Sequence, residues 1–232
     1  MTKLSDKYLV REHVAEKIGD EYLIPLLGVW DRFDDIDFDK LPQRFALKTN
    51  HGTETNIIVH NKDILNMKDA KDCFDFWMSL NYAFIFGYQL QYRDIKRKII
   101  AEEFIDNGGN DLFVYKVHCF NGQPEYIEYI GGRADDPREI YMDTEWNPVE
   151  FYDAVFPRYE KVPPKPVCLH KLMELASAMS SGWNYVRVDF YILDDGSIKF
   201  GEMTFTPGSG QYTWNPLWAD TFLGEKIILP NS

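Results

Sequence analysis

Two short glycine turns constrain the fold of this chain more than any other feature, because each joins two strand-like runs directly. The first turn, Asn121-Gly122, separates LFVYKVHCF from QPEYIEYIGGR, and the second, Asp195-Gly196, separates VRVDFYILD from SIKFGEMTF. Asn-Gly and Asp-Gly favour two-residue turns whose twist matches that of the flanking strands. Two tight hairpins predict antiparallel pairing and argue against a doubly wound parallel sheet.

The rest of the chain adds further strands and a few helices to these hairpins. RFALKTN and NIIVHN predict two strands joined by a polar loop, and RKIIAEEFI predicts a strongly apolar strand. EYLIPLLGVW is interrupted by Pro25 and Gly28, and the acidic stretch after it has the character of a surface connector. Residues spaced as on one face of a helix predict helices near 5–18, 69–84 and 168–182.

This order of elements predicts an α+β fold with two lobes built on antiparallel sheets. We expect the division near residue 106, with 1–105 holding the N-terminal helices and the first lobe, and 106–232 holding the second lobe with the closing hairpin.

Charge and composition exclude several classes of function. The formal net charge is -12, whereas a broad grip on nucleic acid needs clustered Lys and Arg. The sequence has no apolar run long enough to span a bilayer, and its charged N-terminus lacks the features of a secretory signal. Three widely spaced cysteines indicate a reducing compartment, so we expect a cytoplasmic protein with no nucleic-acid partner and no membrane span.

The closing hairpin brings two acids together. A two-residue turn at Asp195-Gly196 places Asp189 opposite Glu202 and Arg187 opposite Thr204, with all four side chains on one face. A three-residue loop would slip this register by one and move one carboxylate to the apolar side. Facing carboxylates repel unless a cation lies between them, and Mg²⁺ is typically held by one or two carboxylates plus substrate phosphates. A solvated acidic face is the alternative interpretation.

At these residues the sequence resembles the ATP-grasp superfamily, whose signature is R-x-D, a hairpin, E-x-N and then P-G. The corresponding residues here are Arg187-Val188-Asp189, Glu202-Met203-Thr204 and Pro207-Gly208. The chain is most similar to the TupA-like branch, which occurs with teichuronopeptide and capsular polysaccharide biosynthesis. DKYLVREHV, LIPLLGVWD, LPQRFALKTNHG, IIAEEFI, FNG and FGEMTFTPGSG carry this likeness in the expected order.

The resemblance implies that the two lobes hold ATP between them and that Mg²⁺ assists. Asp189, Glu202 and Thr204 would be the metal ligands, with Thr204 standing where the family usually has Asn. Arg187 would steady the transferred phosphate, and Lys48 would reach the nucleotide phosphates. Further residues are implied by position: Arg11, Glu102, Glu103, Phe104, Ile105 and Lys116 for the nucleotide, and Arg133, Ser209 and Gly210 for the substrate.

For several of these residues a structural role, without function in binding or catalysis, stays open. Arg187 is also suited to a structural salt bridge with Asp189 or Glu202, and Lys48 to a solvated strand end. His51 and His118 lie beside the motifs, where packing or capping histidines are commoner than general bases. The aromatic tail QYTWNPLWADTF suits either a packed core or a sugar-stacking or protein interface.

The activity that the resemblance implies is that of an ATP-dependent carboxylate–amine ligase working through an acyl phosphate. The pathways with which this branch occurs suggest the substrates. They would be a uronic-acid or glutamyl carboxylate and an amino acid or another amine, joined in surface polysaccharide biosynthesis. A kinase acting on a sugar or small molecule, and a non-catalytic nucleotide- or glycan-binding module, are the alternatives. A homo-oligomer or polysaccharide-assembly partners are compatible with each.

Overall fold

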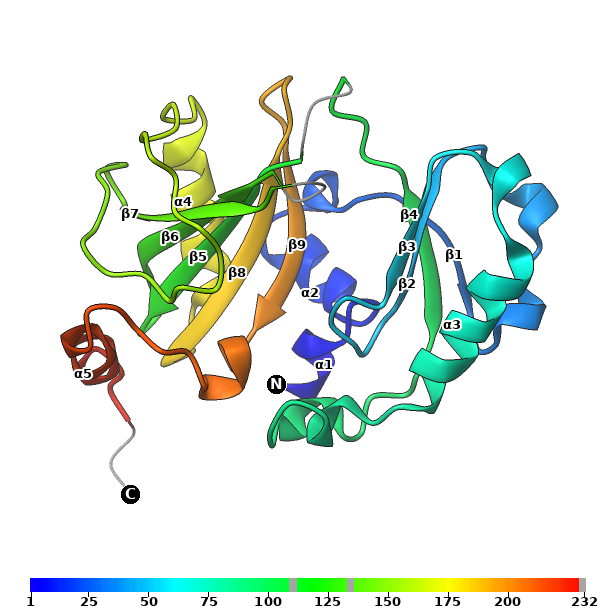
Figure 1. The fold of residues 1–232 in the computed structure, drawn as a ribbon, viewed down its shortest axis with the longest axis horizontal. Coiled ribbons are helices and arrows are strands. Elements are labelled where there is room, and N and C mark those ends of the chain that lie inside the picture. The colour runs from blue at the N-terminus through cyan, green and yellow to red at the C-terminus, as the bar shows by residue number, and fades with distance from the viewer. Residues whose placement is uncertain (109–111, 133–135, 230–232) are drawn as a thin grey trace. The chain divides into compact units, whose positions relative to one another are not determined.

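The computed structural model describes residues 1–108, 112–132 and 136–229. The chain forms two compact units, each with its own antiparallel sheet (Figure 1). The first unit comprises Met1–His13 and Leu23–Asp106, and the second comprises Val14–Tyr22 and Asn107–Ser232. The short segment Val14–Tyr22 therefore belongs with the second unit, although it precedes most of the first unit in the sequence.

The first unit is a four-stranded sheet in the order β1-β4-β2-β3. In β2, buried and half-buried residues alternate, as expected of a strand with one face in the core. Helix α3 lies against the sheet (Figure 1) and packs Phe74 into the apolar cluster there. The helix begins where the Asn66 side chain accepts from two backbone N–H groups. The strands are β1 (Leu26–Trp30), β2 (Phe45–Thr49), β3 (Asn56–Val59) and β4 (Ile99–Glu103), and α3 spans Met67–Ser79.

The N-terminal helix expected near 5–18 is divided. Helix α1 covers Thr2–Ser5 and helix α2 covers Val10–Lys17. Between them the Asp6 carboxylate accepts from the backbone N–H groups of Tyr8 and Leu9, as a helix-capping side chain does. Asp6 thus forms the hydrogen bonds of a helix cap, while the chain before it forms a separate helical turn.

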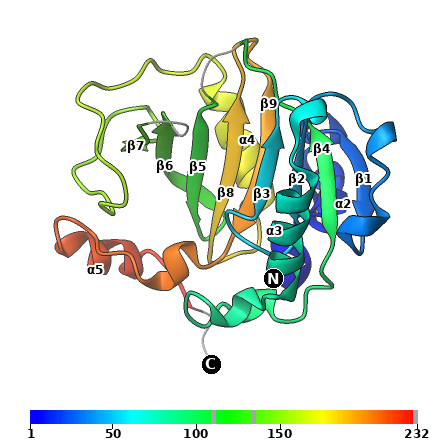
Figure 2. The same ribbon diagram turned by 45° about the vertical axis from the view of Figure 1, so that its right-hand side comes forward.

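The second unit is a five-stranded sheet in the order β7-β6-β5-β8-β9, with every neighbouring pair antiparallel. Helix α4 packs against β5, β6 and β8, and Figure 2 shows it behind them. The Cys119 thiol on β5 points to the Ala176 carbonyl of α4, so this face of the sheet is the apolar one. The elements are β5 (Val114–Phe120), β6 (Gln123–Gly131), β7 (Arg138–Asp143), α4 (Leu169–Ser180), β8 (Tyr185–Ile192), β9 (Ile198–Thr204) and α5 (Trp218–Glu225).

Short 3-10 turns complete the connections, at Asp20–Tyr22, Phe33–Asp35, Phe38–Lys40, Lys62–Ile64, Tyr82–Phe84, Leu90–Tyr92 and Pro207–Gly210. The aromatic tail divides its side chains between core and surface: Trp214 packs against Phe151 and Tyr141, whereas Trp218 is half exposed. None of the described helices is long and apolar enough to cross a lipid bilayer.

Two strands, β1 and β7, were not predicted from the sequence. Strand β1 is half-buried along its whole length and therefore shows no alternation, and its pairing with β4 shifts between Leu26 and Gly28. The glycine that suggested a break instead lies at a β-bulge. Strand β7, directly after Pro137, was also not predicted.

The first predicted hairpin is confirmed. Asn121 and Gly122 have φ values of 52° and 77°, and they connect Phe120 to its partner Gln123. Positive φ at both central residues is what a type I′ turn requires, which explains why the chain uses Asn-Gly here.

The closing hairpin reaches the predicted pairing by a different route. Asp189 pairs with Glu202 and Arg187 pairs with Thr204, as expected. Nearer the turn, however, Ile192 pairs with Ile198, and the strands are joined by a longer loop than the predicted two-residue turn. The register shifts between Asp189 and Phe190, where β9 carries one extra residue, Gly201. This bulge cancels the slip of the loop and keeps both acids on one face.

Replacing the bulge glycine tests how tightly this register is held. A Cβ at Gly201 would lie 3.0 Å from the Asp189 carbonyl oxygen, which is backbone and moves only with the strand. We expect Gly201→Ala to reduce the free energy of unfolding by about 1–3 kcal/mol, measured by urea denaturation. Gly224→Ala is the matched control, because a Cβ at Gly224 in α5 meets nothing within 4 Å. Equal stability of the two variants would contradict a close-packed bulge.

Candidate functional site

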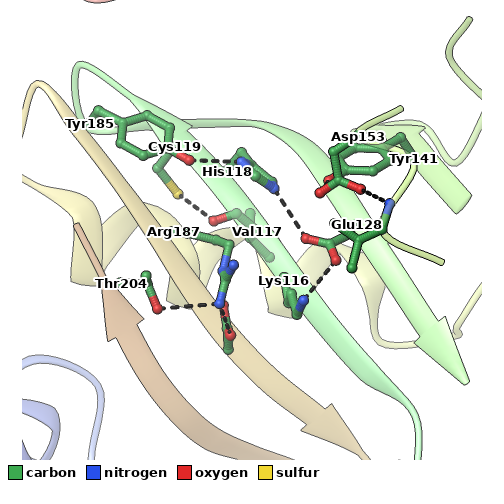
Figure 3. A network of polar contacts seen from close by, with 12 residues as sticks. Lys116, Val117, His118, Cys119, Glu128, Tyr141, Asp153, Tyr185, Arg187 and Thr204 are labelled. Atoms are coloured by element: carbon green, nitrogen blue, oxygen red, sulfur yellow. Dashed lines mark hydrogen bonds and ion pairs between the residues drawn. The ribbon is translucent and has the colours of Figure 1, made fainter. Parts of the chain in front are cut away.

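The face of the second sheet opposite α4 carries a continuous row of polar side chains. Strand pairing sets Lys116 between Asp189 and Glu128, and Glu202 lies beyond Asp189. A second row one step along the strands contains His118, Arg187 and Thr204 (Figure 3). Side chains two residues apart on a strand share a face, so both rows belong to one surface.

Arg187 is the hub of this surface. Its Nε and Nη2 donate to the two carboxylate oxygens of Asp189, both at 2.7 Å. Nη2 also lies 3.5 Å from Glu202 Oε1 and 3.3 Å from Thr204 Oγ1. The side chains of Arg187 and Asp189 are each 7% exposed, whereas that of Glu202 is 34% exposed. A guanidinium thus occupies the position between the two acids.

Burial and charge act in opposite directions on this group. Burial raises the pKa of Asp189, the Arg187 guanidinium lowers it, and the nearby Glu202 carboxylate raises it again, leaving it above its ordinary value. Burial acts to lower the pKa of Arg187, but Asp189 and Glu128 hold it well above its ordinary value. Arg187 is therefore permanently charged, and Asp189 depends on it for ionisation.

Lys116 and His118 connect this group to the next strand. Lys116 Nζ lies 2.7 Å from Glu128 Oε1, and His118 Nε2 lies 3.6 Å from Glu128 Oε2. The other imidazole nitrogen, Nδ1, is 2.9 Å from the hydroxyl of Tyr185. Burial alone would raise the pKa of Glu128, but the fields of Lys116, His118 and Arg187 bring it below its ordinary value.

Two further buried acids border the row. Glu139 on β7 and Asp153 in the following loop are 0% and 4% exposed. The Tyr141 hydroxyl donates to Asp153 Oδ2 at 3.0 Å (Figure 3). Burial, and next the Asp153 charge, raise the pKa of Glu139 to about 9.

The first unit holds a separate charged group. Glu102 on β4 is buried and forms ion pairs with Lys48 on β2 and with Arg11, whose Nη1 lies 3.0 Å from Glu102 Oε1. Arg11 also donates to the carbonyl of Ile24 at 2.8 Å. Lys48, Arg11 and Glu102, three residues far apart in sequence, are thus brought together, with two positive charges on one acid.

The residues after Glu102 lead out of β4. The Glu103 side chain is exposed, and its backbone N–H donates to the Pro25 carbonyl at 2.9 Å. The Phe104 ring is half-buried and lies 4.0 Å beneath the Arg44 guanidinium carbon. Ile105 is half-buried.

The predicted substrate residues follow β9. Gly208, Ser209 and Gly210 have φ values of 52°, 59° and 70°, so three consecutive residues adopt the left-handed region. Ser209 is strained there, because an L-residue in this region costs about 1–2 kcal/mol. Arg133, the remaining predicted substrate residue, lies outside the described residues.

Comparisons with known proteins identify the family. The family model of TupA-like ATP-grasp proteins matches residues 1–228. The chain belongs to the TupA-like ATP-grasp family. Comparison of the sequence with curated proteins finds no match.

Solved ATP-grasp structures share the fold of this TupA-like chain. L-amino acid ligase from Bacillus licheniformis superposes with a TM-score of 0.51 at 15% identity, covering 90% of this chain and 44% of that one. N5-carboxyaminoimidazole synthetase from Staphylococcus aureus gives a TM-score of 0.50 at 11% identity, covering 87% and 44%. An ADP complex of N5-carboxyaminoimidazole ribonucleotide synthetase gives 0.50 at 9% identity, covering 88% and 45%. The chain thus spans less than half the length of each, and the predicted α+β ATP-grasp fold is confirmed.

Sequence reasoning about this TupA-like chain missed Glu128 as the partner of Lys116, and the reason is a second bulge. A plain two-residue turn at Asn121-Gly122 would set Lys116 opposite Ile127. The register instead shifts between His118 and Cys119, so that Glu128 faces Lys116. The sequence signal is weak: Pro124 and Glu125 near the turn are the residues around which the strand bulges.

His51 is buried and lies edge-on to the Tyr82 ring, with the ring centroids 5.5 Å apart. Burial first, and then the nearby Arg97 and Lys7 charges, lower the pKa of His51 to about 4. The imidazole is therefore neutral near pH 7 and packs as a core group, so a catalytic role for it stays a prediction without support.

The depressed pKa of His51 predicts a loss of stability in acid. The unfolded chain binds a proton at His51 below pH 6.5 but the folded chain does so only near pH 4, so this stability is full above 6.5 and falls as the pH drops. Between those limits we expect wild type to lose about 3 kcal/mol more unfolding free energy than His51→Gln. Denaturant titrations at several pH values measure this difference. His170→Gln, at an exposed histidine, should keep the wild-type slope; a wild-type slope in His51→Gln would contradict the prediction.

Proposed function

We propose that this chain is an ATP-dependent carboxylate–amine ligase that works through an acyl phosphate. The observation that carries the proposal is the Arg187 hub, where a permanently charged guanidinium, two carboxylates and a hydroxyl converge on one sheet face. Phosphoryl transfer needs positioning and charge neutralisation more than covalent chemistry by the protein, and this group supplies both.

The donor atoms around Arg187 suit Mg²⁺. Asp189, Glu202 and Thr204 offer only oxygen, which is the ligand type that Mg²⁺ prefers. The Glu202 side chain is partly exposed, and its contact with Arg187 is long, at 3.5 Å. A metal ion can therefore compete with Arg187 for the Glu202 carboxylate. Asp189, Glu202 and Thr204 would hold the ion, and its charge would neutralise the nucleotide phosphates.

Lys48 and Arg11 supply further positive charge. Both pair with Glu102, whose single negative charge offsets only one of their two positive charges. The remaining positive charge is available to phosphate oxygens. We also assign Lys116 on the second sheet to the nucleotide, where it would turn from its present partner Glu128 toward the phosphates. We assign adenine recognition to Glu102, Glu103, Phe104 and Ile105, and acceptor-substrate contacts to Ser209, Gly210 and Arg133.

The reaction has two balanced steps. A substrate carboxylate oxygen attacks the γ-phosphorus of ATP, forming an acyl phosphate and releasing ADP. An amine nitrogen then attacks the acyl carbon, inorganic phosphate leaves with the C–O bonding pair, and the amine loses its proton to water. Arg187 stabilises the charge on the transferred phosphoryl group in the first step and on the leaving phosphate in the second.

The family and its neighbours support this reaction class. L-amino acid ligase is named as joining amino acids, and N5-carboxyaminoimidazole ribonucleotide synthetase was solved with ADP. We propose a uronic-acid or glutamyl carboxylate as one substrate and an amino acid or other amine as the second, in surface polysaccharide biosynthesis. Three free cysteines favour the cytoplasm as its place of action.

One observation favours a second candidate, a non-catalytic nucleotide- or glycan-binding module. Both oxygens of Asp189 accept from Arg187, so the ion pair is complete without a metal. Such a module would bind nucleotide or glycan with no turnover.

Hydroxylamine trapping separates these candidates, because it detects an acyl phosphate before the amine is known. With ATP, Mg²⁺ and pools of carboxylates, we expect hydroxamate formation by wild type and losses of at least about 100-fold in Glu202→Gln and Lys48→Ala. Glu174→Gln and Lys68→Ala are matched controls at exposed positions and should keep wild-type rates. Retained activity in Glu202→Gln or Lys48→Ala would remove that residue from the mechanism, and a phosphorylated hydroxyl product would select a kinase.

A further inference from the structure

Three acids outside the Arg187 hub converge at the edge of the second sheet. Glu128, Glu139 and Asp153 each place one carboxylate oxygen within 4.8 Å of those of the other two. Their residues are 1%, 0% and 4% exposed. We refer to these three residues as the acid triad.

The fold holds the third member of the triad in place from both sides. Asp153 follows Tyr152, whose backbone N–H and carbonyl pair with Asn215 at 3.0 and 2.8 Å. On its other side the chain bonds back to Glu139, whose N–H donates to Pro157 and whose carbonyl accepts from Tyr159, both at 3.0 Å. The Asp153 carboxylate also accepts from the Tyr141 hydroxyl and from the Val155 N–H. Its position is therefore fixed by the backbone.

Neither carboxylate oxygen of Glu139 has an N–H or hydroxyl donor in the described part of the chain, and its acidic neighbour Asp153 can share a proton with it. Glu139 is 0% exposed, so bulk water does not reach it. Glu128 Oε2 is likewise buried without a hydrogen bond. A buried carboxylate without donors costs several kcal/mol unless it is neutralised. When ionised, Glu139 and Asp153 offer each other only acceptors, whereas Glu128 also accepts from Lys116 through Oε1.

The local charge does not balance. Lys116 is the described basic group whose field stabilises the charged form of Glu139, and it is already bonded to Glu128 at 2.7 Å. Arg187 is engaged by Asp189 and Glu202. Lys116, His118 and Arg187 all stabilise the charge of Glu128, whereas Lys116 is the one of these three groups that acts on Glu139. An ionised Glu139 beside Asp153 therefore needs a further cation, and without one it is neutralised by a proton.

We propose that the acid triad is a second cation site, which binds a hard divalent ion of about the size of Ca²⁺ through one oxygen each of Glu128, Glu139 and Asp153. The site is distinct from the magnesium site assigned to Asp189, Glu202 and Thr204, and it does not depend on the proposed ligase activity.

Ligand type and spacing select the class of ion. The three donors are carboxylate oxygens, with no nitrogen or sulfur among them, so hard cations are favoured over Zn²⁺ or Cu²⁺. The three oxygens lie within 4.8 Å of one another, close enough to share one ion. Carboxylates fixed by strand and loop backbone form an irregular set of ligands, which suits the flexible coordination of Ca²⁺ better than the near-octahedral coordination that Mg²⁺ demands.

Terbium luminescence provides a direct test, because Tb³⁺ replaces Ca²⁺ and is sensitised by nearby phenol and indole rings. Tyr141 donates to Asp153 and lies 5.6 Å from the Trp214 ring, so bound Tb³⁺ should emit when these rings are excited. We expect saturable emission from the full chain, displaced by Ca²⁺ more readily than by Mg²⁺. Glu139→Gln, which keeps size and shape, should weaken Tb³⁺ binding at least about tenfold.

Two controls keep the test decisive. Glu160→Gln removes an exposed acid from the same segment, and Asp189→Asn removes an assigned magnesium ligand; both should keep the triad emission. Calorimetry of wild type with Ca²⁺ provides a reading that needs no variant. Equal Tb³⁺ affinity of wild type and Glu139→Gln, or no saturable Ca²⁺ binding by wild type, would overturn the proposal and leave a proton as the neutralising partner of Glu139.

Discussion

The buried ion pair of Arg187 and Asp189 is the interaction on which the functional surface of the second unit depends. Two bonds of 2.7 Å hold the guanidinium flat against the carboxylate, and the same Nη2 reaches Glu202 and Thr204. Because Asp189 is buried, its charge is stable only while a cation lies beside it. The Arg187 guanidinium thereby offsets the repulsion between the two acids that face each other across β8 and β9.

Two β-bulges decide which residues share this surface. The extra residue Gly201 restores the register of β8 and β9, so that Glu202 stays beside Asp189. The bulge in β6 turns Glu128, in place of Ile127, toward Lys116. Since a one-residue slip moves a side chain to the opposite face, each bulge exchanges an apolar residue for an acid on the polar side. These local shifts thus set the charge pattern on the polar face of the sheet.

The sequence was sufficient for the fold class and for the central pairs of the site. Asn121-Gly122 predicted its hairpin because the required positive φ values select these residues, and the register assumed at Asp195-Gly196 predicted the facing acids Asp189 and Glu202. The two-residue loop predicted at Asp195-Gly196 was wrong. The predicted pairing of Arg187 with Thr204 was right only because the extra residue Gly201 compensates for the longer loop. Glycine within a strand pattern is the available signal for a bulge, but its direction and size depend on tertiary contacts.

The acid triad shows the other limit of prediction from sequence. Glu139 and Asp153 are brought together by loop-to-strand bonds at Pro157, Tyr159 and Asn215, none of which has a local sequence signature. The ion pairs of Glu102 with Lys48 and Arg11 have the same origin. Charged groups that are far apart in sequence are paired by the topology of the fold. Hydrophobic periodicity and turn residues are local signals and do not predict such pairs.

A double-mutant cycle on the free energy of unfolding measures the Arg187–Asp189 pair most directly. Arg187→Met leaves a buried carboxylate uncompensated and should cost about 3–5 kcal/mol, whereas Arg187→Met combined with Asp189→Leu removes both charges. The combined variant should therefore be more stable, by at least about 2 kcal/mol, than the sum of the single losses predicts. Additivity within about 0.5 kcal/mol would contradict the coupling and would mean that Asp189 does not need Arg187 beside it.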